Sequence, residues 1–257
     1  MSTGKFVWFE LMTKDVEKAE KFYSRLFGWT VKPFPMEGMV YNIFQIGEKG
    51  VGGMMAMTPD MQFPPHWLTY LEVDDVDAAA ALTVKEGGSI AMPPMDIPNV
   101  GRFAVVCDPQ GAYVAAFKSA PMENEQPNVP PADFEFSWNE LQAADIEKAK
   151  SYYSKLVGCT YTDWDMGPMG KYYTWKNREG KDEYAGMMQI PPGQNYPSHW
   201  MAYVGVPNVD ALADKAVGLG GKMMMPPMDV PDVGRFCLLQ DPTGAGFALC
   251  KFVKQGC

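Results

Sequence analysis

The sequence predicts an α+β protein built from two similar halves, in which strands and helices alternate. Three observations predict this class: a long internal repeat, a proline-rich segment between the two copies, and a hydrophobic pattern that changes in the same order twice within each copy. The chain has 257 residues, which is enough for two domains of ordinary size with a core in each.

The internal repeat sets the domain organisation. The segment Met92–Phe103 returns as Met225–Phe236, with ten of its twelve positions identical. Trp8 corresponds to Trp138, an offset of 130 residues, and later segments are offset by 133. The polar, proline-rich stretch between the copies is typical of an extended linker. We therefore expect a first domain over residues 4–119, a linker over 120–131 and a second domain over 132–253.

Hydrophobic periodicity predicts the elements of each copy. An alternating segment near the start indicates a strand, and Asp15 then caps a helix that Gly28 ends. The same order begins again at His66, where a second strand precedes a helix capped by Asp75. Further short strands are expected around 41–46, 51–57, 89–92, 102–107 and 113–117. Each copy is thus two βαβββ modules, and the chain has four.

Composition limits the partners and the compartment. The net charge of −9, without any basic cluster, argues against nucleic acid. The sequence has no apolar run of membrane-spanning length and no signal-peptide core, so we expect a cytoplasmic protein without a membrane partner, as a monomer or homodimer. Five cysteines without C-x-x-C spacing indicate buried or tail thiols. Twenty methionines suit a soft core or a soft pocket.

Three motifs resemble those of the vicinal oxygen chelate superfamily, which includes glyoxalase I, bleomycin-resistance proteins and extradiol dioxygenases. They are the helix motif at Asp15–Gly28, the V-D-D-V-D-A segment at Val73–Ala78 and the D-P-x-G turn at Asp108–Gly111, and each recurs in the second copy. The pattern is similar to that of bacterial tandem glyoxalase-like proteins, a group that includes a mycobacterial culture-filtrate antigen. The resemblance implies that two βαβββ modules close a curved mixed sheet into a cup that holds a ligand or metal.

The resemblance also implies positions for metal ligands, and the residues there do not suit a cation. These positions fall at Trp8, Leu68, Ala115 and near Met54–Met55 in the first copy, and at Trp138, Met201, Ala248 and near Met187–Met188 in the second. A hard or borderline divalent cation needs His, carboxylate or thiolate donors, which a lone thioether does not replace. We therefore expect no metal and no other cofactor in either copy.

Strand alternation predicts which side chains line each cup. Trp8 shares a face with Glu10 and Met12, and the facing strand presents His66 and Tyr70. The second copy presents Trp138, Glu140, Gln142, His199 and Tyr203 in the same places. If the two strands are antiparallel, each glutamate lies opposite the histidine of its copy. We predict a Glu–His hydrogen bond in each cup, which would raise the pKa of the histidine and lower that of the glutamate. Such a pair could perform acid–base catalysis, bind a polar ligand or lock the strands; two donors are too few for a new metal site.

The motif P-P-M-D-[IV]-P-x-V-G-R-F is a second candidate feature. Its paired prolines predict a stiff loop, and the arginines that follow, Arg102 and Arg235, could clamp an anionic ligand group. In the alternative, the loop packs at the rim and the arginines pair with Asp96 and Asp229.

Three classes of function remain open. The first is a binding protein of the bleomycin-resistance kind, whose metal-free cups hold a small, partly apolar metabolite or drug. The second is a lyase, isomerase or dioxygenase-type enzyme that acts on an oxygenated small molecule, with Glu10, His66, Glu140 and His199 as catalytic residues. The third is a protein-interaction module whose cups are filled by side chains. A fold alone does not choose among these classes.

Overall fold

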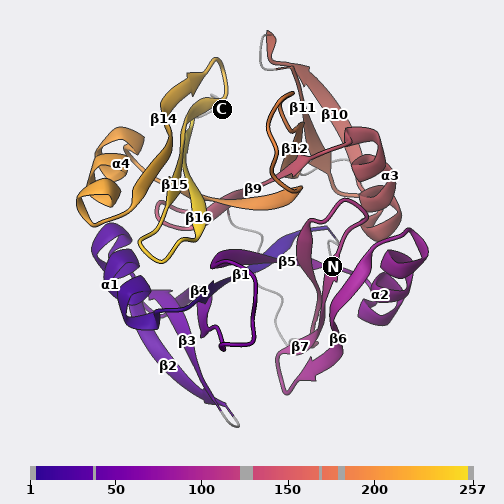
Figure 1. The fold of residues 1–257 in the computed structure, drawn as a ribbon, viewed down its shortest axis with the longest axis horizontal. Helices are drawn as coiled ribbons and strands as arrows, with labels where there is room; N and C mark the ends of the chain where they lie inside the picture. Colours follow the sequence, from indigo (N-terminus) through magenta and orange to yellow (C-terminus); the bar gives the residue numbers. More distant parts are fainter. Residues whose placement is uncertain (1–3, 37–38, 122–129, 168–169, 179–182, 254–257) are drawn as a thin grey trace. The chain divides into compact units, whose positions relative to one another are not determined.

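The structure is a computed structural model that describes residues 4–36, 39–121, 130–167, 170–178 and 183–253. It confirms the α+β class and the four βαβββ modules (Figure 1). The first copy contains β1 (Phe6–Thr13), α1 (Val16–Phe27), β2 (Thr30–Met36), β3 (Met39–Ile46), β4 (Lys49–Ala56), β5 (His66–Glu72), α2 (Val76–Lys85), β6 (Ser89–Ile97), β7 (Gly101–Cys107) and β8 (Tyr113–Ser119). The second copy contains β9 (Phe136–Ala143), α3 (Ile146–Val157), β10 (Thr160–Asp165), β11 (Lys171–Lys176), β12 (Glu183–Gln189), β13 (His199–Gly205), α4 (Val209–Gly218), β14 (Lys222–Val230), β15 (Gly234–Gln240) and β16 (Gly246–Phe252).

The strands form two mixed sheets of eight strands. Their orders are β2-β3-β4-β1-β5-β8-β7-β6 and β10-β11-β12-β9-β13-β16-β15-β14. Within a module the first and last strands pair in parallel, as β1 does with β4, and the remaining pairs are antiparallel. Each parallel pair needs a crossover connection, which the helix of the module supplies. Among the described residues, no helix has the length and apolar character needed to cross a membrane.

The proline-containing segments are strands rather than loops. β6 runs through Pro93 and Pro94, where we expected a stiff loop, and β2 contains Pro33 and Pro35. Both strands lie at the ends of their sheet, where an edge strand can lack an N–H without losing a ladder hydrogen bond. The register between β6 and β7 shifts around the two prolines, so bulges absorb them.

The compact units of the protein combine modules from different copies. The boundaries between the units fall between Val7 and Trp8, Trp67 and Leu68, Ser137 and Trp138, and Met201 and Ala202. One unit contains α1 with α4 and is called the α1/α4 unit; the other contains α2 with α3 and is called the α2/α3 unit. The two helices of each unit lie side by side (Figure 1). Each sheet thus consists of the strands of one copy, whereas each pair of packed helices has one helix from each copy. The domain boundaries at residues 119 and 132 stay a prediction.

A buried chain of hydrogen bonds joins the two copies within the α1/α4 unit. The hydroxyl of Tyr23 on α1 donates to Asp241 Oδ2 at 2.9 Å and accepts from Trp67 Nε1 at 2.9 Å. Asp241 belongs to the D-P-x-G turn before β16, and its other oxygen accepts backbone N–H groups of that turn. Burial, followed by the charge of Asp241, raises the pKa of Tyr23 well above its usual value. The tyrosine therefore stays a neutral donor.

The α2/α3 unit repeats this arrangement. Tyr153 on α3 donates to Asp108 Oδ2 at 3.1 Å and accepts from Trp200 Nε1 at 2.9 Å. Asp108 Oδ1 accepts the N–H groups of Gln110 and Ala112 in the turn before β8. The two D-P-x-G turns therefore each hold a helix of the other copy.

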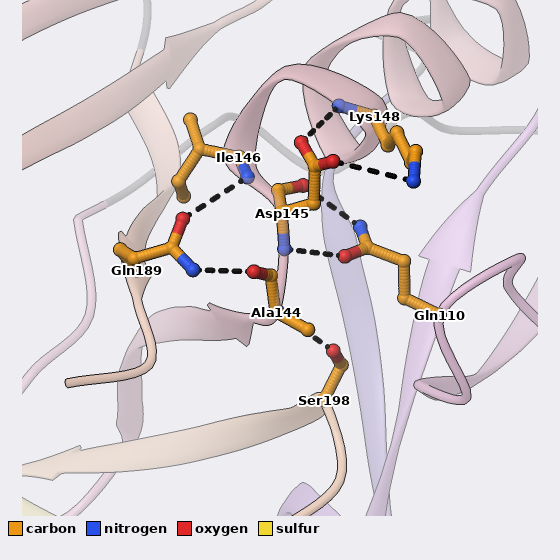
Figure 2. A network of polar contacts seen from close by, with 7 residues as sticks. All are labelled: Gln110, Ala144, Asp145, Ile146, Lys148, Gln189 and Ser198. Carbon is orange, nitrogen blue, oxygen red and sulfur yellow. Dashed lines mark hydrogen bonds and ion pairs between the residues drawn. The ribbon is translucent and has the colours of Figure 1, made fainter. Parts of the chain in front are cut away.

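A polar network surrounds the start of α3 in the α2/α3 unit (Figure 2). Gln110 Oε1 accepts from the N–H of Asp145 at 2.6 Å, and its Nε2 donates to the carbonyl of Asp145 at 3.0 Å. Gln189 bonds in the same two-sided way to Ile146 and Ala144. At the three positions equivalent to Gln110, Gln189 and Ser198, the other copy has Thr243, Ala56 and Pro65. Glutamine side chains thus fix this helix start only in the α2/α3 unit.

Removal of the tyrosine hydroxyls tests the buried chain. We expect Tyr23→Phe and Tyr153→Phe each to lower the free energy of unfolding by about 2 kcal/mol, because a buried aspartate and a tryptophan N–H lose their partner. Urea titration measures the change. The control is Tyr113→Phe, at a half-exposed tyrosine, for which we expect a change within about 0.5 kcal/mol. Equal stabilities for all three variants would contradict the assignment.

Candidate functional site

The first strand of each copy presents a tryptophan and a glutamate on one face. Strand alternation places Phe9 and Leu11 on one face of β1 and Trp8, Glu10 and Met12 on the other, and residues 9–12 are all buried. Glu10 is 6% exposed and Met12 is 7% exposed, while Trp8 is only partly buried. A carboxylate at that depth needs hydrogen-bond donors around it.

Tyr41 on β3 connects these two side chains. Its hydroxyl accepts from Trp8 Nε1 at 2.7 Å and hydrogen-bonds to the carboxylate of Glu10. Burial and the negative charge of Glu10 raise the pKa of Tyr41, so its proton is held in the hydrogen bond. The three residues are called the Trp8–Tyr41–Glu10 cluster, and all lie in the α1/α4 unit.

A glycine makes room for the tyrosine. Glu10 pairs with Gly53 of β4, and a Cβ at Gly53 would overlap the hydroxyl of Tyr41. The hydroxyl therefore lies directly over the backbone of β4, beside the glutamate. A glycine in a strand interior is typical of such a close approach.

The α2/α3 unit contains the equivalent cluster. Trp138 Nε1 donates to the hydroxyl of Tyr172 at 2.8 Å. Gly186, the register partner of Glu140, leaves the space that the Tyr172 hydroxyl occupies. The cluster thus occurs twice, once in each unit, and sequence reasoning missed both tyrosines. The glycines at equivalent strand positions in the two copies were the signal that could have found them.

The second cluster carries an additional polar chain. Gln142 Nε2 donates to Glu140 Oε1 at 3.3 Å, and Gln142 Oε1 accepts from the hydroxyl of Tyr196 at 2.6 Å. Burial and the charge of Glu140 raise the pKa of Tyr196. The first copy has Met12 in place of Gln142.

The two histidines contact carbonyl groups of the loops that precede their strands. His66 Nδ1 lies 3.0 Å from the carbonyl oxygen of Pro64, and His199 Nδ1 lies 3.0 Å from that of Pro197. Each histidine is the first residue of its strand, so its ring turns back toward the loop before it. Burial lowers the pKa of His66, whereas a glutamate partner would raise it.

The predicted rise in the pKa of His66 is therefore wrong, since burial lowers it. The Glu–His hydrogen bond itself stays a prediction. Glu10 faces Tyr41, and Glu140 faces Gln142. A catalytic role for these four residues stays a prediction.

Tyr70 and Tyr203 pack among phenylalanines. Tyr70 is buried in the α2/α3 unit, with ring centroids 5.9 Å from both Phe103 and Phe117. Tyr203 is buried in the α1/α4 unit, at 6.2 Å from Phe236. Both side chains contribute to aromatic packing, and a ligand-binding role for them stays a prediction.

The arginines of the repeated motif are engaged by carboxylates. Arg102 donates from Nε and Nη2 to Asp77 at 2.8 Å each and from Nη1 to Asp96 at 3.0 Å. Arg235 bonds in the same way to Asp210 and Asp229. The alternative that we left open, a pair with Asp96 or Asp229, is thus the one observed, and it adds the first-turn aspartate of α2 or α4. The guanidinium N–H groups that could bind an anionic ligand thus already donate to two carboxylates.

The donor set does not fit the metal that the resemblance implies. Trp8 and Trp138 use their indole N–H groups as donors to tyrosine, and Ala115 and Ala248 are fully buried methyl groups. Within the described ranges, no three His, Cys, Asp or Glu side chains gather closely enough to bind a cation. No step of the chemistry is therefore derived through a metal.

Substitution of the strand glycine tests the close approach of the tyrosine. Gly53→Ala should displace the Tyr41 hydroxyl and lower the free energy of unfolding by about 1–3 kcal/mol, because the added methyl overpacks the cluster. Gly218→Ala is the matched control, since a Cβ there meets open space at the end of α4. We expect it to be neutral or to stabilise by up to about 1 kcal/mol. Thermal unfolding of both variants measures the difference; a tolerated Gly53→Ala would contradict the geometry.

Comparison with known proteins gives consistent matches over the whole chain. The family model described as "Glyoxalase/Bleomycin resistance protein/Dioxygenase superfamily" matches residues 5–115 and 136–249. A Mycobacterium tuberculosis protein named "Putative glyoxylase CFP32" is 36% identical over 257 residues, covering 96% of this chain and 95% of the relative. The anthracycline biosynthesis protein DnrV of Streptomyces peucetius is 30% identical over 267 residues, covering 98% and 94%.

Solved structures share the fold at low identity. The 2,3-dioxygenase LapB from Pseudomonas sp. KL28 matches with a TM-score of 0.65 and 12% identity, over 98% of this chain and 93% of that one. The Mn(II)-bound glyoxalase from Novosphingobium aromaticivorans matches with a TM-score of 0.61 and 16% identity, over 97% and 82%. At such identities the likeness shows the fold alone.

Proposed function

Since the chain belongs to the glyoxalase/bleomycin resistance protein/dioxygenase superfamily, we propose that it binds a small, partly apolar, hydroxylated molecule at two sites without a metal. The observation that carries the proposal is the tryptophan–tyrosine–glutamate cluster, which occurs once in each unit. In each cluster a partly buried indole lies close to a buried carboxylate. This combination suits a ligand with an apolar face and a hydrogen-bond donor.

The glutamates supply the specificity in this proposal. Glu10 and Glu140 are only 6% and 7% exposed, so a ligand that contacts them displaces little water from the carboxylates. A hydroxyl group of the ligand would donate to the carboxylate, a charge-assisted hydrogen bond stronger than a neutral one. Met55 and Met188, both partly buried on the neighbouring strands, would adapt to the apolar part.

The names of two relatives support the proposal. DnrV and its counterpart DauV are named for anthracycline biosynthesis, which concerns aromatic, oxygenated molecules. We extend only the chemical class to this chain: a planar ring system that carries hydroxyl groups. The tryptophans would stack on such a ring system.

A matched pair of probes tests the proposal. We expect 2,6-dihydroxynaphthalene to bind, detected by calorimetry and by ligand fluorescence, and its affinity to be unchanged by EDTA. The variant Glu10→Gln/Glu140→Gln should bind it about tenfold more weakly at each site, because one charge-assisted hydrogen bond per site becomes a neutral one. Binding of 2,6-dimethylnaphthalene, which has no hydroxyl, should not change.

The control variant is Glu17→Gln/Glu147→Gln, which removes two exposed carboxylates from the first turns of α1 and α3. It should bind both probes as the unmodified protein does. If neither probe binds to the unmodified protein, the proposed function is contradicted. Chemical conversion of a bound probe that the Glu10→Gln/Glu140→Gln variant abolishes, with affinity retained, would assign catalysis to the glutamates instead.

A further inference from the structure

The two clusters differ in one corner, where a polar pair in one unit replaces an apolar pair in the other. In the α2/α3 unit this corner holds Gln142 and Tyr196, and in the α1/α4 unit the equivalent positions hold Met12 and Phe63. One neighbour of the corner is the same in both copies, the histidine at the start of the next strand. Phe63 packs edge-on against His66 with ring centroids 5.2 Å apart, and Tyr196 packs against His199 at 5.5 Å.

The polar corner extends the hydrogen bonding of the buried glutamate to the surface. The chain runs from the Tyr196 hydroxyl through Gln142 to Glu140. Tyr196 is 37% exposed, so the outer end of this chain lies at the surface. The hydroxyl of Tyr196 donates its proton to Gln142 and keeps lone pairs that accept a hydrogen bond.

The apolar corner offers none of these groups. Met12 is 7% exposed and Phe63 is 42% exposed, and both present only carbon, hydrogen and a thioether sulfur. A ligand hydroxyl placed against them would lose its hydrogen bond to water without a replacement, which is unfavourable. A methyl group in the same place would instead gain apolar contact.

We propose that the two sites are not equivalent: the site of the second copy selects a ligand with a hydroxyl group at this corner, and the site of the first copy selects the same ring system with an apolar group there. The proposal rests on the proposed function and adds that each chain can hold two differently substituted ligands. Gln142 and Tyr196, with Met12 and Phe63, are the residues that determine the specificity of the sites. One neutral hydrogen bond corresponds to a difference in affinity of about tenfold between them.

Exchange of the two corners tests the proposal by counting sites. The unmodified chain should show one tight and one weak site, about tenfold apart, for 2,6-dihydroxynaphthalene in calorimetry. Met12→Gln/Phe63→Tyr should give two tight sites, and Gln142→Met/Tyr196→Phe should give none. For 2,6-dimethylnaphthalene, Gln142→Met/Tyr196→Phe should give two tight sites and Met12→Gln/Phe63→Tyr should give none. Each new pair already exists at the equivalent place of the other copy, and circular dichroism checks that both variants fold.

The outcomes separate this inference from the proposed function. Two sites of equal affinity, unchanged by either exchange, would overturn the non-equivalence and leave the proposed function standing. Absence of binding by both probes in the unmodified protein would overturn both. If a variant fails to fold, the four single substitutions replace it, and a change in the affinity of one site only still supports the inference.

Discussion

The buried hydrogen-bond chain from tryptophan through tyrosine to aspartate is the interaction on which the arrangement of modules within each unit depends. Tyr23 and Tyr153 each satisfy an aspartate in the turn of the other copy, so a helix and a hairpin that are far apart in sequence become one packed body. One oxygen of each aspartate accepts hydrogen bonds from its own turn. Loss of the tyrosine would leave the other oxygen buried without that hydrogen bond, which is unfavourable. Neighbouring aromatic rings, such as Phe22 and Phe247, pack around the chain and exclude water from it.

Local sequence rules predicted the elements that depend on local chemistry. The cap at Asp15 and the left-handed glycine at position 28 bound α1 where the pattern placed them. The same rules failed at β6, because Pro93 and Pro94 indicate a break unless the strand lies at an edge. Edge position is a property of the whole sheet and is not contained in a short window. Packing of helices across copies was likewise not predictable, since the repeat describes ancestry and not which faces meet.

For the candidate site, too, the sequence predicted the local strand pattern but not the contacts between strands. Period-two alternation placed Trp8 and Glu10 on one face of β1, and both contact Tyr41. It could not identify Tyr41, because that contact depends on the register of two further strands and on the space left over Gly53. The predicted rise in the pKa of His66 was wrong for a related reason. That prediction assumed that antiparallel pairing sets each histidine against its glutamate, whereas a side chain at the first residue of a strand can turn toward the preceding loop.

The distribution of buried polar groups explains why two copies can keep one fold while their sites diverge. At Tyr23 or Tyr153 a change leaves buried atoms unsatisfied, which costs a substantial part of a marginal free energy of folding. At the corner of the site the outer residue is partly exposed, so Phe63 and Tyr196 are both tolerated. The inner residue is less free, because a buried glutamine needs the partners that Tyr196 and Glu140 provide. Glutamine beside phenylalanine would leave the buried amide short of one partner, whereas methionine beside either aromatic residue leaves no buried polar group unpaired, because the outer residue is partly exposed.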